Sequence, residues 1–360
     1  MSITVKALQK TGPKAPFKVV EIERREPTGT DVLIDIKAAG ICHSDIHTIR
    51  NEWGPAHFPL AVGHEIAGVV EAVGPDVTAY RVGDRVGVGC LVGSCGECEQ
   101  CDAGWENRCV KGAIGTYNAV DEDGTITQGG YAEKVTVRER FVCRIPDELG
   151  FFEAAPLLCA GITTYSPIAT WNVKEGDAVA VVGLGGLGHM AVKIAAAKGA
   201  DVTVISRSMK KEADALALGA SQVLATGEDS DVFREHRGEF DVIINTISAP
   251  FSVADYLGLL KPGGTMVLVG LPPEGLALPA GSLINGGRVL AGSNIGGLPE
   301  TQEMLDFCAE HGIGAEVEIV GVRDVDAAYD RVVRGDVHFR FVIDTATFED
   351  APVDRPEIEA

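Results

Sequence analysis

The 360-residue sequence predicts an α/β protein with two domains, one β-rich and one built on a doubly wound parallel sheet. Its length is about twice that of a typical domain, and 46% of its residues are hydrophobic, which is enough for a sizeable core. Short strand-like runs separated by Gly and Pro occupy the part before residue 150. After residue 150, strand-like runs that are apolar throughout alternate along the chain with amphipathic helices. This order indicates a parallel sheet covered on both faces.

The β-rich domain is predicted to contain both ends of the chain. Strand-like runs lie at 32–36, 68–74 and 84–88, and their spacing favours a barrel or a sandwich. A further strand candidate at 339–343 follows the α/β segment, so the chain is expected to return to the first domain. The acidic, proline-bearing tail at 348–360 is expected to be mobile.

The middle of the chain has the order of a doubly wound domain. A helical stretch at 153–169, interrupted by Pro156 and Pro167, comes first. Strands and helices then alternate, at 178–182, 187–198, 202–205, 210–218, 242–244 and 265–269. We therefore expect domains at 1–152 and 153–295, with 296–360 returning to the first.

The net charge of −21 disfavours two classes of partner. Such a surface repels nucleic-acid phosphates and anionic lipid headgroups. No segment is apolar enough over the length needed to cross a bilayer, and the first twenty residues lack the apolar core of a secretory signal. We expect a cytoplasmic protein that binds neither nucleic acid nor membrane.

Four of the nine cysteines are spaced as metal ligands. The pattern Cys95-x2-Cys98-x2-Cys101-x7-Cys109 can close a tetrahedron around Zn²⁺. An iron–sulfur cluster is the alternative, but its bacterial pattern ends with a three-residue gap and a following Pro. Four protein ligands leave no open position, so the lobe at 90–112 is predicted to hold a structural zinc.

A glycine-rich loop follows the strand at 178–182 and opens a helix. In that context G-x-G-x-x-G predicts a dinucleotide site, because its glycines allow a tight turn, approach of the backbone to a pyrophosphate and close packing of helix and sheet. The predicted cofactor-binding residues here are Gly183, Leu184, Gly185, Gly186, Leu187 and Gly188.

The end of the next strand indicates which nucleotide binds. An NAD site carries a carboxylate there for the ribose 2′-hydroxyl. This chain has Ser206, Arg207 and Ser208 instead, followed by Lys210 and Lys211. Hydroxyl donors and cations suit a 2′-phosphate, so the sequence favours NADP(H).

A more dispersed set has Cys42-His43-Ser44-Asp45-x-His47, then His64-Glu65, then Cys159. Each residue alone is compatible with ordinary packing. Two cysteines and a histidine in a chain with a dinucleotide site are also the ligands of a catalytic zinc that keeps one position open for substrate.

These motifs resemble the zinc-dependent medium-chain alcohol dehydrogenases, in the cinnamyl alcohol dehydrogenase-like branch. The resemblance covers nearly the whole chain, and beyond the cysteine lobe and the glycine loop it rests on five segments: 39–45, 59–68, 127–132, 159–165 and 292–294. It implies a GroES-like catalytic domain, a Rossmann domain and a homodimer.

The resemblance also implies a role for individual residues. The catalytic zinc would be held by Cys42, His64 and Cys159, with Glu65 as a transient ligand and Asp45 bonded to a ligand. Ser44 and His47 would form the proton relay. Cofactor contacts would come from His43, Thr163, Thr246, Gly270, Ser293 and Ile295, in addition to Ser206, Arg207, Ser208 and Lys211.

The expected reaction is NADP(H)-dependent hydride transfer between a primary alcohol and its aldehyde, with aldehyde reduction as the favoured direction. Gly115 stands where plant enzymes of this branch carry an aromatic pocket residue, which favours a broad-specificity aldehyde reductase. Trp53 and Leu91 are candidates for an apolar pocket.

Three other functions are compatible with parts of the sequence but are disfavoured by its other features. An NAD-dependent polyol or secondary-alcohol dehydrogenase is disfavoured by Arg207 and its neighbours. A non-catalytic NADPH-binding relative is disfavoured because Cys42, His64 and Cys159 are all present. A zinc-ribbon nucleic-acid module is disfavoured by the charge of −21.

Overall fold

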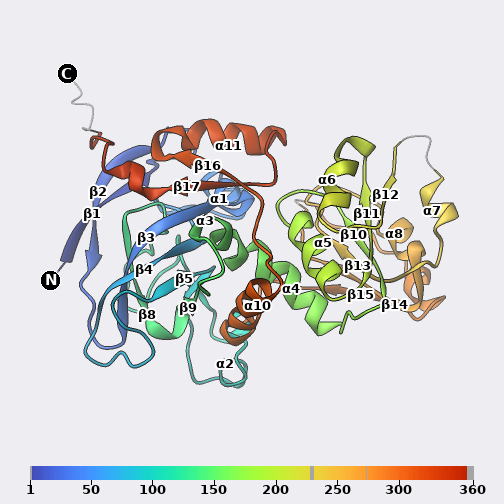
Figure 1. Cartoon of the computed structure of the whole chain (residues 1–360), viewed down its shortest axis with the longest axis horizontal. Helices are drawn as coiled ribbons and strands as arrows, with labels where there is room; N and C mark the ends of the chain where they lie inside the picture. Colours follow the sequence, from blue (N-terminus) through green and yellow to red (C-terminus); the bar gives the residue numbers. More distant parts are fainter. Residues whose placement is uncertain (1, 228–230, 273, 355–360) are drawn as a thin grey trace. The chain divides into compact units, whose positions relative to one another are not determined.

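The computed structural model describes residues 2–227, 231–272 and 274–354. The chain divides into two compact units, of which unit 1 contains Met1–Cys159 and Gly296–Ala360 and unit 2 contains Ala160–Ile295. Figure 1 traces both along the sequence. Within the described ranges, no helix combines the length and the hydrophobicity that crossing a membrane requires.

Unit 1 is built on a seven-stranded mixed sheet centred on β3 (Asp31–Ile41). One edge of β3 pairs with β4 (Ile66–Val73), and the other pairs first with β8 (Lys134–Arg138) and then with β17 (Arg340–Asp344). Nine of the eleven residues of β3 are buried, which is why its run of apolar residues hardly alternates. From β4 the sheet continues through β5 (Arg85–Val88) to β9 (Cys143–Arg144), and from β17 it continues to β16 (Val317–Gly321).

Two smaller sheets and several short helices complete unit 1. The hairpin β1 (Ser2–Gln9) and β2 (Lys18–Arg25) is antiparallel, as is the pair β6 (Leu91–Gly93) and β7 (Ile114–Gly115). The helices are α1 (His43–Ile49), α2 (Glu99–Asp102), α3 (Phe151–Ala154), α10 (Leu298–Glu310) and α11 (Val325–Arg334). The 3-10 turns are η1 (Glu106–Arg108), η2 (Glu139–Phe141), η3 (Ala155–Leu158), η5 (Val322–Asp324) and η6 (Thr345–Phe348).

The C-terminal segment is more ordered than its composition predicts. Lys6 Nζ donates to the carbonyl oxygens of Phe348 at 2.7 Å and Ala351 at 3.0 Å. Asp354 accepts a hydrogen bond from the Val19 amide at 2.7 Å and pairs with Arg323. The expected mobility is therefore wrong for 348–354, because these contacts fasten the segment to the first hairpin. Residues 355–360 lie outside the described part.

Unit 2 is a six-stranded parallel sheet in the order β12-β11-β10-β13-β14-β15. This is the strand order of a Rossmann fold, with the reversal between β10 and β13. The strands are β10 (Ala178–Val182), β11 (Asp201–Ser206), β12 (Gln222–Ala225), β13 (Phe240–Asn245), β14 (Leu260–Leu268) and β15 (Val289–Gly292). The predicted fold class is thereby confirmed for both the mixed sheet and the parallel sheet.

Helices cover both faces of the unit 2 sheet, with α5 and α8 on opposite sides (Figure 1). Pro167 lies inside α4 without ending it, and the helix predicted at 210–218 begins instead as a 3-10 turn. The elements are α4 (Ala160–Thr170), α5 (Gly188–Ala197), η4 (Met209–Lys211), α6 (Glu212–Ala217), α7 (Val232–Glu235), α8 (Val253–Leu259) and α9 (Gly281–Ile284).

Candidate active site and metal groups

Four buried side chains of unit 1 converge on one point, namely Cys42, His64, Glu65 and Cys159. Their ligand atoms all lie within 4.8 Å of one another. The two thiol sulfurs are 4.0 Å apart, and His64 Nε2 is 3.2 Å from Cys159 Sγ. Two thiolates, an imidazole and a nearby carboxylate form a donor set that suits Zn²⁺ with one position left open.

Three separate segments deliver these ligands. Cys42 follows the last residue of β3 and is the N-cap of α1, while Cys159 follows the 3-10 turn η3. His64 follows Gly63, whose φ is +103°, a value that L-residues with side chains rarely adopt. A Cβ at Gly63 would also lie 2.4 Å from the ring of Tyr131. Glycine is therefore required immediately before the histidine ligand.

Asp45 orients the histidine and the first turn of α1. Its Oδ1 is 3.1 Å from His64 Nδ1, and its Oδ2 accepts hydrogen bonds from the Cys42 amide at 2.9 Å and the Tyr131 hydroxyl at 3.1 Å. The carboxyl group is completely buried. A carboxylate on Nδ1 leaves Nε2 as the nitrogen that can bind a metal.

Glu65 is held at the edge of the group by Arg340. The two side chains form a buried ion pair through Arg340 Nη2 and Glu65 Oε1, and Arg340 Nη1 lies 4.0 Å from Cys42 Sγ. The second oxygen, Oε2, is buried and has no hydrogen-bond partner in the described protein. Gly40 makes room, because a Cβ there would stand 1.9 Å from Glu65 Oε2. An unsatisfied buried carboxylate oxygen beside two thiols fits a cation at this place.

In the absence of a metal, the three ligands differ in how readily they lose a proton. The hydrogen bond with Cys159 and the charge of Arg340 hold the pKa of Cys42 well below its usual value. Burial lowers the pKa of His64, but the negative charges around Cys90 and Asp45 outweigh it and raise that pKa well above normal. A hydrogen bond with Cys42 raises the pKa of Cys159. One thiol therefore ionises readily while its partner keeps the proton, which a metal would displace.

Cys90 lies beside the catalytic group, and its sequence context does not single it out. Its thiol hydrogen-bonds with Cys159, and this bond lowers the pKa of Cys90. The residue lies in the short segment between β5 and β6, at the first residue of the lobe at 90–112. A lone cysteine outside a spaced motif gives no signal in the sequence, so only the fold could reveal it.

The second metal group contains Cys95, Cys98, Cys101 and Cys109, whose ligand atoms lie within 4.8 Å of one another. The Cys95 and Cys101 sulfurs are 3.9 Å apart, and the Cys95 amide donates to Cys109 Sγ at 3.5 Å. Four thiols with no further ligand position form a closed structural zinc site. The structure therefore confirms the predicted pair of zinc groups, one catalytic and one structural.

Arg140 and Glu106 brace the structural lobe. Arg140 Nη2 donates to the Cys101 carbonyl at 2.9 Å and to Glu106 Oε1 at 3.2 Å. The buried Glu106 also accepts from the Leu298 amide at 3.0 Å, at the first residue of α10. This carboxylate connects the lobe to the segment where the chain re-enters unit 1.

In unit 2 the glycine loop stands at the carboxyl end of β10, beside the strand reversal. Gly183 has a φ of +91°, and a Cβ at Gly188 would lie 2.0 Å from the Gly183 carbonyl oxygen. Gly185 faces open space, with nothing within 4 Å of a Cβ built there. These three positions meet the steric demands of a pyrophosphate loop. Thr246 Oγ1 donates to the Val182 carbonyl at 2.8 Å at the same end of the sheet.

The predicted 2′-phosphate residues lie at the end of β11. Ser206 is half-buried, while Arg207 and Ser208 are exposed. Lys211 Nζ donates to the Leu184 carbonyl at 3.2 Å, which places this cation beside the glycine loop. Elsewhere in unit 2, Thr163 is buried in α4, and Gly270, Ser293 and Ile295 follow the last two strands of the sheet. Ile295 has a φ of +45°, an uncommon value for a β-branched residue.

Ser44 and His47 lie three residues apart on α1 and share a face of that helix. Ser44 Oγ is 3.5 Å from Cys42 Sγ, and His47 Nδ1 pairs with Glu52 Oε2. The ring of His47 also stacks on Trp53 at 4.7 Å. His43, the predicted pyrophosphate contact, is exposed on the same helix. Glu52 was not predicted, and it reaches His47 because Asn51, with a φ of +58°, reverses the chain after α1.

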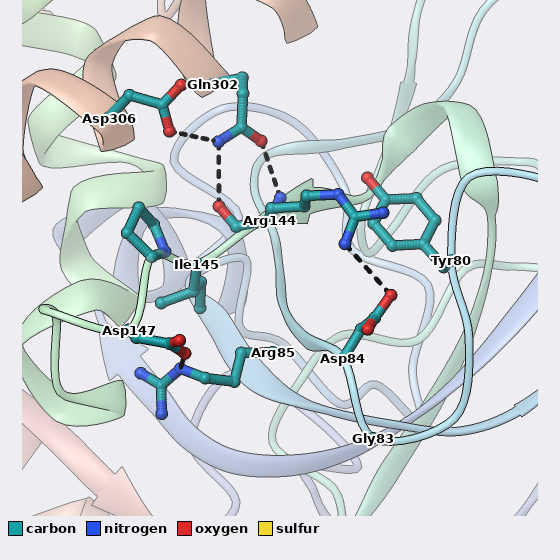
Figure 2. A pocket seen from close by; sticks show the side chains of 10 residues that line it. Tyr80, Gly83, Asp84, Arg85, Arg144, Ile145, Asp147, Gln302 and Asp306 are labelled. Carbon is teal, nitrogen blue, oxygen red and sulfur yellow. Dashed lines mark hydrogen bonds and ion pairs between the residues drawn. The ribbon is translucent and has the colours of Figure 1, made fainter.

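A separate hollow of about 690 Å³ lies away from both thiol groups (Figure 2). Its cations are already neutralised, since Arg144 pairs with Asp84 at 3.1 Å and Arg85 lies 3.5 Å from Asp147. The Gln302 side chain bonds both the amide and the carbonyl of Arg144 and so docks α10 on β9. Apart from Arg85 Nε, which has no hydrogen bond within the described residues, these charged and amide groups pair with one another, and no residue of either thiol group lines the hollow, so it is not a candidate active site.

Comparison with known proteins assigns the family. Residues 28–147 match the alcohol dehydrogenase GroES-like domain, and residues 186–310 match the zinc-binding dehydrogenase domain. The chain is 55% identical to NADP-dependent alcohol dehydrogenase C 1 of Mycolicibacterium smegmatis over 345 residues, covering 96% of this chain and 99% of that protein. It belongs to the zinc-dependent medium-chain alcohol dehydrogenases. The predicted resemblance is thereby confirmed.

Two further relatives place this zinc-dependent dehydrogenase within the family. Aldehyde reductase YahK of Escherichia coli is 48% identical, with 96% of this chain and 99% of that protein covered. The solved structure of a cinnamyl alcohol dehydrogenase from Sorghum bicolor superposes with a TM-score of 0.93 at 42% identity, covering 98% of this chain and 100% of that one. The chain therefore lies in the cinnamyl alcohol dehydrogenase-like branch.

Proposed function

We propose that the protein reversibly transfers a hydride between NADP(H) and a primary alcohol or its aldehyde. The observation that carries the proposal is the convergence of Cys42, His64 and Cys159 in one buried group, with Asp45 bonded to His64. Zinc bound there supplies a Lewis acid for the substrate oxygen, and NADPH supplies the hydride. A relative bearing the name aldehyde reductase supports reduction of aldehydes as the favoured direction.

The chain's own residues supply proton transfer and positioning. Ser44, beside Cys42, is placed to give a proton to the substrate oxygen. We assign His47 as the outer end of the relay, with Glu52 accepting a hydrogen bond from the His47 ring. Asp45 holds His64, and Glu65, through its unpaired oxygen, would be a further ligand for a zinc bound at this group.

The cofactor preference is assigned to the cations after β11. Arg207 is exposed, no carboxylate occupies this strand end, and Lys211 lies against the glycine loop. The remaining cofactor contacts assigned to the loop, to Thr163 and Thr246 and to Gly270, Ser293 and Ile295 are part of the same proposal.

Arg207→Asp tests this preference. It replaces a cation that suits the 2′-phosphate with an anion, so KM for NADPH should rise about 10- to 100-fold while KM for NADH changes little. The matched control is Arg234→Asp, an equal charge change at an exposed residue of α7. Equal loss with both cofactors would contradict the assignment. A wild-type preference for NADH would favour the alternative, an NAD-dependent polyol or secondary-alcohol dehydrogenase.

The substrate range is proposed to be broad. Gly115 pairs with Leu91 in the small β6–β7 sheet and offers no side chain to a pocket, and Trp53 is 50% exposed beside His47. Initial rates with aliphatic and aromatic aldehydes test this breadth. If the protein with both zinc ions turned over no aldehyde, a non-catalytic NADPH-binding role would replace the proposal.

The homodimer and the cytoplasmic location are likewise proposals. The outer edge of β15 pairs with no described strand, and exposed apolar side chains lie on or near it, among them Leu271, Ile284 and Val289. Ile284, at 76%, is the most exposed large apolar side chain among the described residues. Ile284→Asp should therefore yield a monomer in light scattering, while Leu216→Asp on α6 should not. None of the nine cysteines forms a disulfide, which supports a reducing compartment.

A further inference from the structure

A chain of hydrogen bonds runs from the C-terminal helix α11 to the histidine of the catalytic group. The Tyr329 hydroxyl donates to the Tyr131 hydroxyl oxygen at 3.2 Å, and Tyr131 donates to Asp45 Oδ2 at 3.1 Å. The other oxygen of Asp45 lies 3.1 Å from His64 Nδ1. All four residues are buried, so water does not compete for these bonds.

The direction of the chain follows from the chemistry of its members. An ionised carboxylate can only accept hydrogen bonds, so the Tyr131 hydroxyl must be the donor to Asp45. The oxygen of Tyr131 is then free to accept from Tyr329. Burial raises the pKa of both tyrosines well above the usual value, so both hydroxyls stay protonated and keep this order.

Packing fixes the two rings as firmly as the hydrogen bonds fix their hydroxyls. The Tyr131 ring presses on the backbone of Gly63, the residue before the histidine ligand. Phe17 meets Tyr329 edge-on, with ring centroids 5.1 Å apart, and Tyr131 at 6.0 Å. Neither hydroxyl can leave its partner without disturbing this aromatic cluster.

We propose that Tyr131 and Tyr329 are positioning residues for the catalytic zinc, acting in series through Asp45 on His64. Asp45 Oδ2 has two donors, the Cys42 amide and the Tyr131 hydroxyl. Without the hydroxyl, only the Cys42 amide remains on that oxygen and only the Gly63 amide, at 3.2 Å, donates from the backbone to Oδ1, so the carboxylate is oriented less tightly. The bond to Nδ1 weakens and the histidine holds the metal less tightly. Tyr329 strengthens the same contact by polarising the hydroxyl of Tyr131.

The inference rests on zinc binding at the Cys42 group, and zinc retention is the property to measure. Holoprotein is mixed with a chromophoric chelator, and the release of each zinc is followed over time. The structural zinc is an internal reference in the same molecule, and Cys159→Ser identifies the phase of the catalytic zinc by removing it. Tyr80→Phe is the matched control, because its half-buried hydroxyl donates to the Val142 carbonyl and contacts neither zinc group.

Tyr131→Phe should accelerate loss of the catalytic zinc about 10-fold and leave the structural phase unchanged. Tyr329→Phe should have a smaller effect in the same direction. The double variant should match Tyr131→Phe alone, because Tyr329 acts only through Tyr131. With cobalt in the catalytic position, Tyr131→Phe should shift the visible d–d bands, which report ligand geometry, whereas Tyr80→Phe should not.

Four outcomes would overturn the proposal. Unchanged release of the catalytic zinc in Tyr131→Phe would remove its basis, and equal acceleration of both zinc phases would show a general loss of packing. Multiplied effects in the double variant would mean that the tyrosines act separately. A wild-type protein that releases only one zinc would overturn the catalytic metal assignment, and with it the role of the hydrogen-bond chain. Two zinc phases in the wild type, with catalytic-zinc release unchanged in Tyr131→Phe, would overturn the role of the hydrogen-bond chain alone.

Discussion

The two thiol groups of unit 1 differ in how the sequence assembles them. The structural group takes all four ligands from Cys95 to Cys109, a stretch that folds into one lobe. The catalytic group takes its ligands from Cys42, His64 and Cys159, which only the folded sheet brings together. Local spacing is therefore sufficient to hold a metal, whereas a metal with an open position needs the long-range fold.

Their surroundings differ as well. Buried charges, those of Asp45 and Arg340, contact the catalytic ligands. In the lobe, backbone groups contact a ligand instead. Hydrogen bonds from the N–H groups of Cys101 and Val110 lower the pKa of Cys98 to about 6. Charged partners can tune reactivity, while backbone donors stabilise thiolates without adding a titrating group.

Removing one ligand from each group should separate their roles. Cys159→Ser should lower kcat/KM on the order of 10³-fold, because Lewis-acid stabilisation contributes several kcal/mol. Cys98→Ser should retain turnover per folded molecule but lose several kcal/mol of unfolding free energy. Metal analysis, steady-state rates and thermal melts measure the difference, and each variant should keep one of the two zinc ions.

The comparison would fail if both variants lost activity and stability together. Cys308→Ser, at a buried thiol outside both groups, controls for the simple loss of a sulfur.

In protein stripped of zinc, alkylation should sharpen the contrast. Backbone hydrogen bonds lower the pKa of Cys98 to about 6, whereas burial raises that of Cys143 to about 12. At pH 7.5 Cys98 is a thiolate and Cys143 is not, so Cys98 should react on the order of 10²-fold faster with iodoacetamide. Its rate should fall about tenfold per unit below pH 6. Peptide mass spectrometry gives the order of labelling, and equal rates would contradict the assigned environments.

The smallest effect concerns the brace of the lobe. Arg140→Gln leaves the buried Glu106 without its cation and frees the Cys101 carbonyl, which should cost about 1–3 kcal/mol and speed release of the structural zinc alone. Arg108→Gln is the control, since Arg108 lies over Trp105 in the same lobe. Thermal melts and chelator assays measure both, and accelerated loss of the catalytic zinc would show that the two groups are not independent.

The sequence predicted what is local or periodic. The four-cysteine lobe follows from its spacing, and the strand at 178–182 with its glycine loop follows from an apolar run that ends in Gly183. The joining of Cys42, His64 and Cys159 came from the family resemblance, because no periodicity connects residues so far apart.

Three contacts of the site residues, those of Arg340, Cys90 and Glu52, escaped prediction for a physical reason. Arg340 has the sequence context of an ordinary strand residue, and only β17 pairing with β3 brings it to Glu65. Cys90 contacts Cys159 from the short connection between β5 and β6, and Glu52 reaches His47 because the chain reverses at Asn51. The tail at 348–354 was expected to move because its composition is polar, but a single lysine, Lys6, binds its carbonyls.

The division of the chain has a consequence for engineering. Unit 2 is one uninterrupted stretch, Ala160–Ile295, and every side chain of both thiol groups belongs to unit 1. A chimera that exchanges the nucleotide module between these two junctions should keep both metals, provided that its upstream splice retains Cys159, the last residue before the junction. Coenzyme preference, carried by unit 2, and metal binding, carried by unit 1, can then be changed independently of each other.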